Sequence, residues 1–201
     1  MSSTTAVITR IAITAAGAAI LLTATSRAAE AQAVPGTGWE FMVTSGTVVP
    51  TGAQRDAIRR GGLTAAQLTY APSPSFALTS SLGWARSRDI ATAGDPKLDV
   101  FTYDVGAEVR AHRLLERKRL SLTPFAGIGA GGRSYNYRSL DVDATHNAAA
   151  YASAGGELGL GRVRMRVEAR NYVSGFKPLV GAGATDTRND VAVTVGFRIV
   201  R

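Results

Sequence analysis

Hydrophobic and polar residues alternate along most of the chain with a period of two. This is the spacing of a β-strand whose two faces meet different surroundings. In the segment 99–112, Phe101, Tyr103, Val105 and Val109 share one face, and Thr102, Asp104, Glu108 and Arg110 share the other. The alternation predicts eight strands, some of them only weakly marked: 38–48, 63–71, 76–84, 99–112, 121–133, 149–160, 163–170 and 191–199.

The connections between these segments differ in length in a regular way. Long connections are predicted at 49–62, 86–98, 134–148 and 174–189, short ones at 72–75 and 161–162, and an intermediate one at 113–120. Long outer loops that alternate with tight periplasmic turns are typical of transmembrane barrels, whose tilted strands need about 9–11 residues each to cross the bilayer. The predicted fold is an all-β, eight-stranded, antiparallel up-and-down transmembrane β-barrel, because sixteen strands would not fit in this chain.

The first 33 residues have the three parts of a secretory signal peptide. Arg10 precedes an uncharged run from Ile11 to Thr25, and a small-residue stretch ends at Ala33. We expect cleavage after Ala33, which leaves a barrel domain of 34–201. An uncleaved anchor is the alternative, although the run is short for a spanning helix. No second apolar run of that kind follows, which argues against a helical membrane protein.

The strands of a soluble lipocalin-like barrel also alternate between apolar and polar residues, but their apolar face points inward. Three features favour the opposite polarity. Arginine facing lipid costs about 2–4 kcal/mol at mid-membrane, so the charged face of 163–170 must point inward. The expected inward face is rich in glycine: Gly127, Gly129, Gly131, Gly155 and Gly159. Aromatic residues are expected in two outward girdles, Trp39, Phe41, Tyr70, Phe76, Phe125 and Phe197 at one level and Trp84, Phe101, Tyr103, Tyr135, Tyr137, Tyr151, Tyr172 and Phe176 at the other.

Three stretches of this sequence resemble a known family. They are Val49-Pro50-Thr51-Gly52, PFAGIGAGGRSY at 124–135 and VEARNYV at 167–173, together with the final alternating segment. The chain resembles the small outer-membrane β-barrel proteins that include the transmembrane domain of OmpA and the opacity-type proteins. The resemblance implies an outer-membrane barrel over 34–201 and indicates architecture more than activity.

Charged residues on the inward face are expected to pair, since an isolated buried charge is costly. The sequence offers Glu40, Asp104, Glu108, Glu157 and Glu168 against Arg110, Arg133, Arg164, Arg166, Arg170 and Arg198. The core of the predicted structural network is Asp104, Glu108, Arg110, Glu157, Arg164, Arg166, Glu168 and Arg170. A gated ion path is the alternative interpretation, but an eight-stranded interior is nearly filled by side chains.

Few residues offer catalytic or metal chemistry. The chain has no cysteine, which excludes disulfides and thiol catalysis, and its only histidines are His112 and His146. Asp141, Asp143 and His146 form a weak candidate cation cluster in a predicted loop. We therefore expect no catalytic residues, no cofactor and no metal site. Five arginines in predicted outer loops are candidate contacts for lipopolysaccharide phosphates: Arg55, Arg59, Arg60, Arg86 and Arg88.

These observations favour a non-enzymatic barrel of the cell outer membrane with a structural or surface-interaction role. A narrow transporter or binding barrel for a small or apolar solute is one alternative, and a lipid-modifying hydrolase is another. The expected partners are outer-membrane lipids, lipopolysaccharide and the outer-membrane assembly machinery during biogenesis. The net charge of +8 does not indicate nucleic-acid binding, because the basic residues are dispersed. We expect a monomer.

Overall fold

The structure is a computed structural model that describes residues 37–111, 115–117, 120–138, 140–176 and 186–199. The predicted signal peptide at 1–33 and His112 lie outside the described residues. Within the described part, the strands are β1 (Gly38–Thr51), β2 (Gly61–Ser73), β3 (Phe76–Arg88), β4 (Lys97–Arg110), β5 (Leu115–Arg117), β6 (Leu120–Tyr137), β7 (Thr145–Leu160), β8 (Val163–Phe176) and β9 (Asp186–Ile199).

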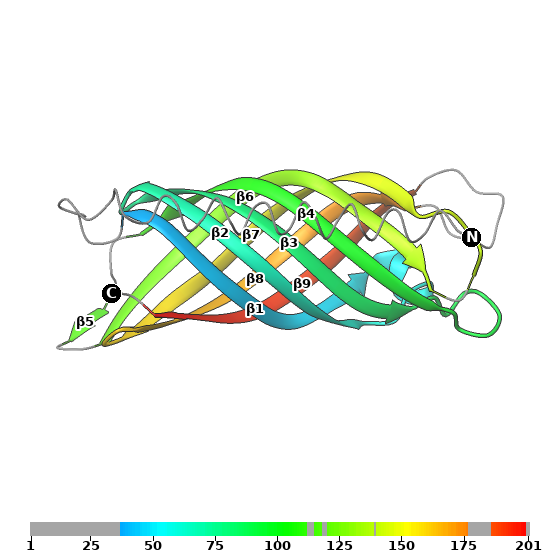
Figure 1. The fold of residues 1–201 in the computed structure, drawn as a ribbon, viewed down its shortest axis with the longest axis horizontal. Helices are drawn as coiled ribbons and strands as arrows, with labels where there is room; N and C mark the ends of the chain where they lie inside the picture. The colour runs from blue at the N-terminus through cyan, green and yellow to red at the C-terminus, as the bar shows by residue number, and fades with distance from the viewer. Residues whose placement is uncertain (1–36, 112–114, 118–119, 139, 177–185, 200–201) are drawn as a thin grey trace, which may run out of the picture. The chain divides into compact units, whose positions relative to one another are not determined.

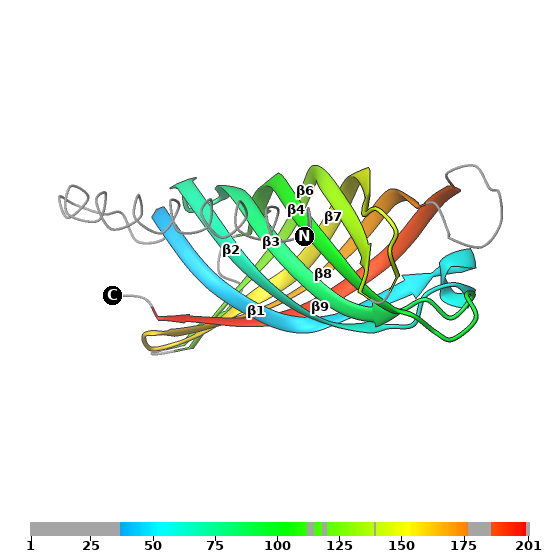
Figure 2. The same cartoon turned by 45° about the vertical axis from the view of Figure 1, so that its right-hand side comes forward.

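Eight of the described strands form a closed antiparallel ring. Each strand pairs with its neighbour in the chain, β1 pairs with β9, and β4 pairs with β6 to complete the circle. The short β5 pairs only with β6 and extends one edge of the ring. Figures 1 and 2 show the strands winding around a common axis with a strong tilt. The predicted up-and-down barrel is confirmed.

The strands are longer than the sequence indicated. The alternation marked 121–133 and 191–199, whereas β6 and β9 extend over Leu120–Tyr137 and Asp186–Ile199. The residues predicted as long loops therefore belong partly to strands. About 9–11 residues are enough for a tilted strand to cross hydrocarbon, and the described strands of the ring continue beyond that length.

The ring has two different ends. We call the end with the connections 52–60, 89–96 and 138–144 the loop end, and the end with the turns at 74–75 and 161–162 the turn end. The connection 111–119, expected to be intermediate, is as long as the connection 52–60. The predicted alternation of long and short connections is therefore wrong at this position, where the chain forms the additional strand β5.

The two faces of the ring differ as the alternation predicted. Along β3 every second residue from Phe76 to Arg88 is exposed, and the residues between them are buried or half-buried. On β4, Tyr103 and Val105 point outward, whereas Asp104 and Glu108 point inward. Large apolar side chains thus cover the outside of the ring and charged ones occupy its inside.

The described residues contain one short helix, the 3-10 helix η1 (Gly52–Asp56), between β1 and β2. Within the described residues, no helix is both long and apolar enough to cross a membrane.

Candidate functional site

Ten charged side chains inside the barrel form one continuous series of ion pairs with alternating sign. We call this series the ion ladder. In order from the turn end, its members are Arg164, Glu157, Arg198, Glu40, Arg110, Glu108, Arg166, Glu168, Arg170 and Asp104. Cations and anions are equal in number along it, so the series needs no counter-ion.

The turn-end part of the ladder joins five strands. Arg198 on β9 lies 2.8 Å from Glu157 on β7 and 2.6 Å from Glu40 on β1. Arg110 on β4 donates two hydrogen bonds to the Glu40 carboxylate, at 3.2 and 3.0 Å. Arg164 approaches Glu157 at 3.8 Å. Each carboxylate therefore lies between two guanidinium groups, which offsets part of the cost of removing it from water.

The ladder continues through the middle of the barrel. Arg110 donates to Glu108 at 2.8 Å, and Glu108 also accepts two hydrogen bonds from Arg166. Arg166 lies 2.9 Å from Glu168, and its guanidinium carbon is 3.5 Å from the ring centre of Phe125. The Arg166 cation therefore has carboxylates in its plane and an aromatic ring over its face, an arrangement suited to a planar guanidinium.

The last cation of the ladder is Arg170, which pairs with Glu168 and lies 3.5 Å from Asp104. It also donates to the Ser81 hydroxyl at 2.8 Å. Asp104 in turn accepts hydrogen bonds from Ser81 at 3.2 Å and from the Tyr172 hydroxyl at 2.6 Å. At this end of the ladder, the hydroxyl groups of Ser81 and Tyr172 donate hydrogen bonds to the last carboxylate.

The structure brings the predicted network residues together. All eight core residues of the sequence-based network lie in the ladder, with Glu40 and Arg198 as further members. Arg133 was grouped with them, but it forms a separate ion pair with Asp190 on β9. Sequence reasoning missed Asp190 because it began the last strand at residue 191. The alternation of Arg188, Asp190 and Ala192 would have indicated the longer strand.

The Arg133–Asp190 pair lies nearer the loop end and is deeply buried. The Arg133 side chain has an exposed fraction of 0%, and its guanidinium carbon lies 4.5 Å from the ring centre of Tyr172. A charge with so little contact with water depends on its partner.

The predicted aromatic girdles are partly wrong. The outward, exposed positions are confirmed for Trp39, Phe41, Tyr70, Phe76, Phe197, Trp84, Phe101 and Tyr103. Five others point inward and are buried, namely Phe125, Tyr135, Tyr137, Tyr151 and Tyr172. The side chain of Phe176 lies outside the described residues. Tyrosine suits both a lipid interface and a polar interior, so its presence in an alternating strand does not identify the face it occupies.

Inward glycines make room for some of these rings. Gly129 is the cross-strand partner of Tyr151, and Gly155 is the partner of Phe125. A Cβ atom at Gly129 would overlap the Tyr151 ring, and one at Gly155 would overlap the Phe125 ring. The predicted inward direction of these glycines is confirmed, and their function is to let two rings lie flat against the barrel wall.

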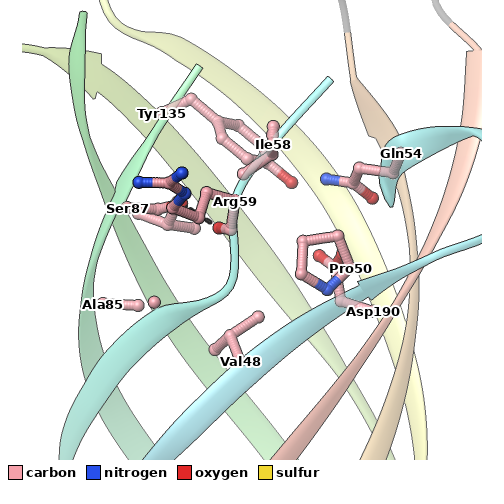
Figure 3. Close-up of a pocket in the computed structure, with 11 residues that line it drawn as sticks. Val48, Pro50, Gln54, Ile58, Arg59, Ala85, Ser87, Tyr135 and Asp190 are labelled. Atoms are coloured by element: carbon pink, nitrogen blue, oxygen red, sulfur yellow. Dashed lines mark hydrogen bonds between the residues drawn. The ribbon is translucent and has the colours of Figure 1, made fainter. Parts of the chain in front are cut away.

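The connection 52–60 folds into the loop end of the barrel. Gln54 of η1 and Ile58 are 1% and 4% exposed, and Ile58 joins a buried apolar cluster with Val48, Leu98 and Tyr135. Figure 3 shows Gln54, Ile58, Val48 and Tyr135 around a small pocket at this end. The cavity volume is about 10 Å³, which is enough for one water molecule. We call Gln54 and Ile58 the plug. No pattern in the sequence indicates it, since the segment has no periodicity.

The Asp89 side chain holds the second connection to β6, and a backbone hydrogen bond holds it to the first connection. The Asp89 carboxylate accepts hydrogen bonds from the backbone of Ala91 and Thr92 at 3.0 and 3.1 Å, and from the Tyr137 hydroxyl at 2.7 Å. The backbone of Ile90 donates to Ala57 at 2.8 Å. Two connections therefore close over the barrel as one hydrogen-bonded unit.

The five arginines proposed for phosphate contacts are all exposed at the loop end. Arg86 and Arg88 lie on the outward face of β3, Arg55 lies on η1, and Arg59 and Arg60 directly precede β2.

The candidate catalytic and cation-binding residues are not assembled into a site. His146 is exposed on β7 opposite Ser134, and no hydrogen bond joins the two side chains among the described contacts. In the described parts of the chain, no group of three or more His, Asp or Glu side chains is placed to hold a metal ion. This applies to Asp141, Asp143 and His146.

Charges inside and apolar residues outside give this barrel a reversed polarity. That is the opposite of a soluble barrel. Among the exposed large side chains of the outward face are Phe41, Leu82, Val105, Ile128 and Phe197. They come from five different strands of the ring.

Comparison with solved structures gives similar folds at low identity. Neisserial surface protein A is 11% identical, with a TM-score of 0.49, over 82% of this chain and 99% of its own. The N-terminal β-barrel domain of Pseudomonas aeruginosa OprF is 12% identical, with a TM-score of 0.46, over 81% and 98%. Ail, the attachment invasion locus protein of Yersinia pestis, is 10% identical, with a TM-score of 0.42, over 80% and 97%. No protein-family model and no curated protein sequence matches the chain.

Proposed function

We propose that this chain is an integral outer-membrane β-barrel with a structural or surface-interaction role, and that its lumen is closed. The observation that carries the proposal is the reversed polarity of the ring. Exposed apolar side chains on all sides would be unfavourable in water, and a closed ring of strands satisfies the backbone hydrogen bonds that hydrocarbon cannot. The signal-peptide pattern at 1–33 supports export.

Two features support a closed lumen. The ion ladder crosses the interior from β7 to β1, β4 and β8, so its guanidinium groups occupy the space that a water-filled path would need. The plug of Gln54 and Ile58 fills the loop end. An eight-stranded barrel has an interior just wide enough for side chains.

We assign no catalytic role to the barrel. A hydrolytic nucleophile needs a base within hydrogen-bonding reach and a third group to orient that base. His146 is hydrogen-bonded to neither a hydroxyl nor a carboxylate among the described residues. Lipid turnover by the purified protein that is lost in His146→Ala would contradict this part of the proposal.

The membrane assignment is tested by fractionation and by electrophoresis. We expect the protein in the outer-membrane fraction, with an unboiled band that migrates differently from the boiled one because the closed barrel resists the detergent. Recovery in the soluble periplasmic fraction, or identical migration of the two samples, would reject it.

A further inference from the structure

Basic side chains gather on one side of the outward loop-end rim. Arg86 and Arg88 lie on the exposed face of β3, Lys97 is exposed at the start of β4, and Arg138 is exposed directly after β6. Arg88 is the cross-strand partner of Lys97, and the Arg138 backbone donates to the Lys97 carbonyl at 3.1 Å. The register therefore places these four residues next to one another, and we call them the basic rim.

Two acidic residues lie near the basic rim. Asp99, the cross-strand partner of Arg86, lies 3.0 Å from the Arg138 guanidinium. Asp95 is exposed in the connection 89–96, where its backbone carbonyl accepts a hydrogen bond from Arg88 at 3.3 Å. Four cations thus face two carboxylates, and Lys97 has no described ion pair. The surface keeps an excess of positive charge.

The rest of the loop-end rim is different. The outward residues described on β7, β8, β9 and β1 at this end are His146, Ala148, Val173, Gly175, Thr187, Asn189, Val49 and Thr51. None of these described positions carries a lysine, an arginine or an acid. The other exposed charges at this end lie in the connections and not on outward strand positions: Arg55, Asp56, Arg59, Arg60, Asp141 and Asp143.

An aromatic row lies directly below the basic rim. Trp84 and Phe101 are cross-strand partners and both are exposed; Trp84 is two residues from Arg86 on β3, and Phe101 is four residues from Lys97 on β4. Two strand residues span about 6.6 Å. The Arg86 guanidinium carbon lies 4.1 Å from the centre of the Trp84 ring, which holds the cation just above the ring. Below them, Leu82 and Tyr103 continue the apolar surface.

We propose that the basic rim binds the phosphorylated headgroup of a lipid in the outer leaflet, with the lipid's acyl chains along the apolar surface of β3 and β4. Aromatic rings mark the level of the membrane interface, and the phosphate layer lies just above it. Guanidinium groups pair with phosphate oxygens in a bidentate manner, and two arginines with a lysine match a lipid that carries more than one phosphate. The inference rests on the proposed membrane insertion.

The binding test uses Trp84 as the reporter. The chain has two tryptophans, so Trp39→Phe leaves only Trp84, which lies below the rim. The variant is folded in zwitterionic detergent micelles and titrated with bis-phosphorylated lipid A, dephosphorylated lipid A or inorganic phosphate. We expect the Trp84 emission to shift with the first probe only, and the apparent affinity to fall when salt is raised, because salt screens exposed charges.

Two double variants in the Trp39→Phe background then locate the site. Arg88→Gln with Lys97→Gln removes two rim charges, and we expect binding to weaken about thirtyfold. The control, Lys118→Gln with Arg162→Gln, removes one lysine and one arginine from the connections 111–119 and 161–162, at the opposite end of the ring. We expect the control to bind like the parent.

Three results would overturn the proposal. Equal binding by the two double variants would show that the rim is not the site. An equal response to dephosphorylated lipid A would show that acyl chains suffice, and an equal response to inorganic phosphate would show that the ligand is not a lipid. Failure of the proposed membrane fold would be visible before any titration, as the absence of a heat-sensitive band shift.

Discussion

At the scale of single residues, glycines opposite aromatic rings determine how closely neighbouring strands pack. Tyr151 lies over Gly129 inside the barrel, and on the outside Gly132 is the cross-strand partner of Tyr103, whose ring a Cβ there would overlap. A ring that covers a glycine shields backbone that has no side chain of its own. The glycines of β6 are therefore packing positions and not merely flexible ones.

We predict that Gly129→Ala destabilises the barrel by about 1–3 kcal/mol, because the new methyl group must displace the Tyr151 ring. The measurement is urea unfolding of the folded protein in lipid vesicles, followed by tryptophan fluorescence. Gly62→Ala is the control, since a Cβ at Gly62 has no atom within 4 Å. It should change stability by less than about 0.5 kcal/mol. Equal stability of the two variants would contradict the packing role of Gly129.

The pair of Arg133 and Asp190 gives a second prediction. Asp190→Ala leaves the fully buried Arg133 guanidinium without its carboxylate, and we expect a loss of about 3–5 kcal/mol in the same unfolding assay. The double variant Arg133→Met with Asp190→Leu removes both charges and should be more stable than Asp190→Ala. If the double variant is instead the less stable one, Arg133 does not depend on Asp190.

At the scale of elements, the alternation in the sequence predicted which face of each strand is buried, but not where the strands end. The period of two predicts that Asp104, Glu108 and Arg166 point inward, and all three are buried in the barrel. It could not give their partners, since Arg166 and Glu108 are 58 residues apart and meet only through the tilt of the strands around the ring. The end of each strand depends on pairing with its neighbours, as at Asp190.

The plug at the loop end was not predictable for a different reason. Gln54 and Ile58 lie in a segment without alternation, and they are buried because the connection folds back into the barrel. Local sequence does not show whether such a connection extends into water or turns inward. The hydrogen bond between Asp89 and Tyr137 holds the second connection against the same opening.

We predict that Tyr137→Phe loosens the loop end without opening the barrel. Loss of the hydrogen bond to the Asp89 carboxylate should increase amide exchange of 89–96 about tenfold, with a smaller increase in 52–60. Hydrogen–deuterium exchange with mass spectrometry measures it. Tyr70→Phe, a change at an exposed tyrosine near the other end, should leave both segments unchanged. Unchanged exchange in Tyr137→Phe would show that Asp89 is held by its backbone contacts alone.

At the scale of the whole molecule, the apolar outside of the ring and the ion pairs inside it are two consequences of the same alternation. Below the loop-end rim the outward face is apolar, so the charged side chains of the strands there lie inside. The interior is narrow enough for them to reach partners on other strands. Arg110 bridges from β4 to Glu40 on β1, and Arg170 reaches Ser81 on β3. The charged side chains of the interior are thus paired with one another, whereas in a hydrated channel they would be solvated by water.

We predict negligible conductance of the folded protein in planar bilayers, because the side chains of the ladder and of the plug occupy the described part of the interior. The control is Ile58→Asp, which places a charge in the apolar cluster at the loop end but leaves the ladder intact, and it should remain closed as well. Steady openings of porin size in the parent protein would refute a closed lumen.

The ladder also has a consequence for how the ring closes. The seam between β1 and β9 is the pairing made last along the chain, and Arg198 and Glu40 meet across it. A slip of one residue would turn every side chain of β9 to the opposite face and place Arg198 on the apolar outside of the ring. A slip of two would move Arg198 about 6.6 Å along the barrel, away from both Glu40 and Glu157. The ion pairs of Arg198 therefore favour the correct register during assembly, because only this seam brings Arg198 next to both Glu40 and Glu157.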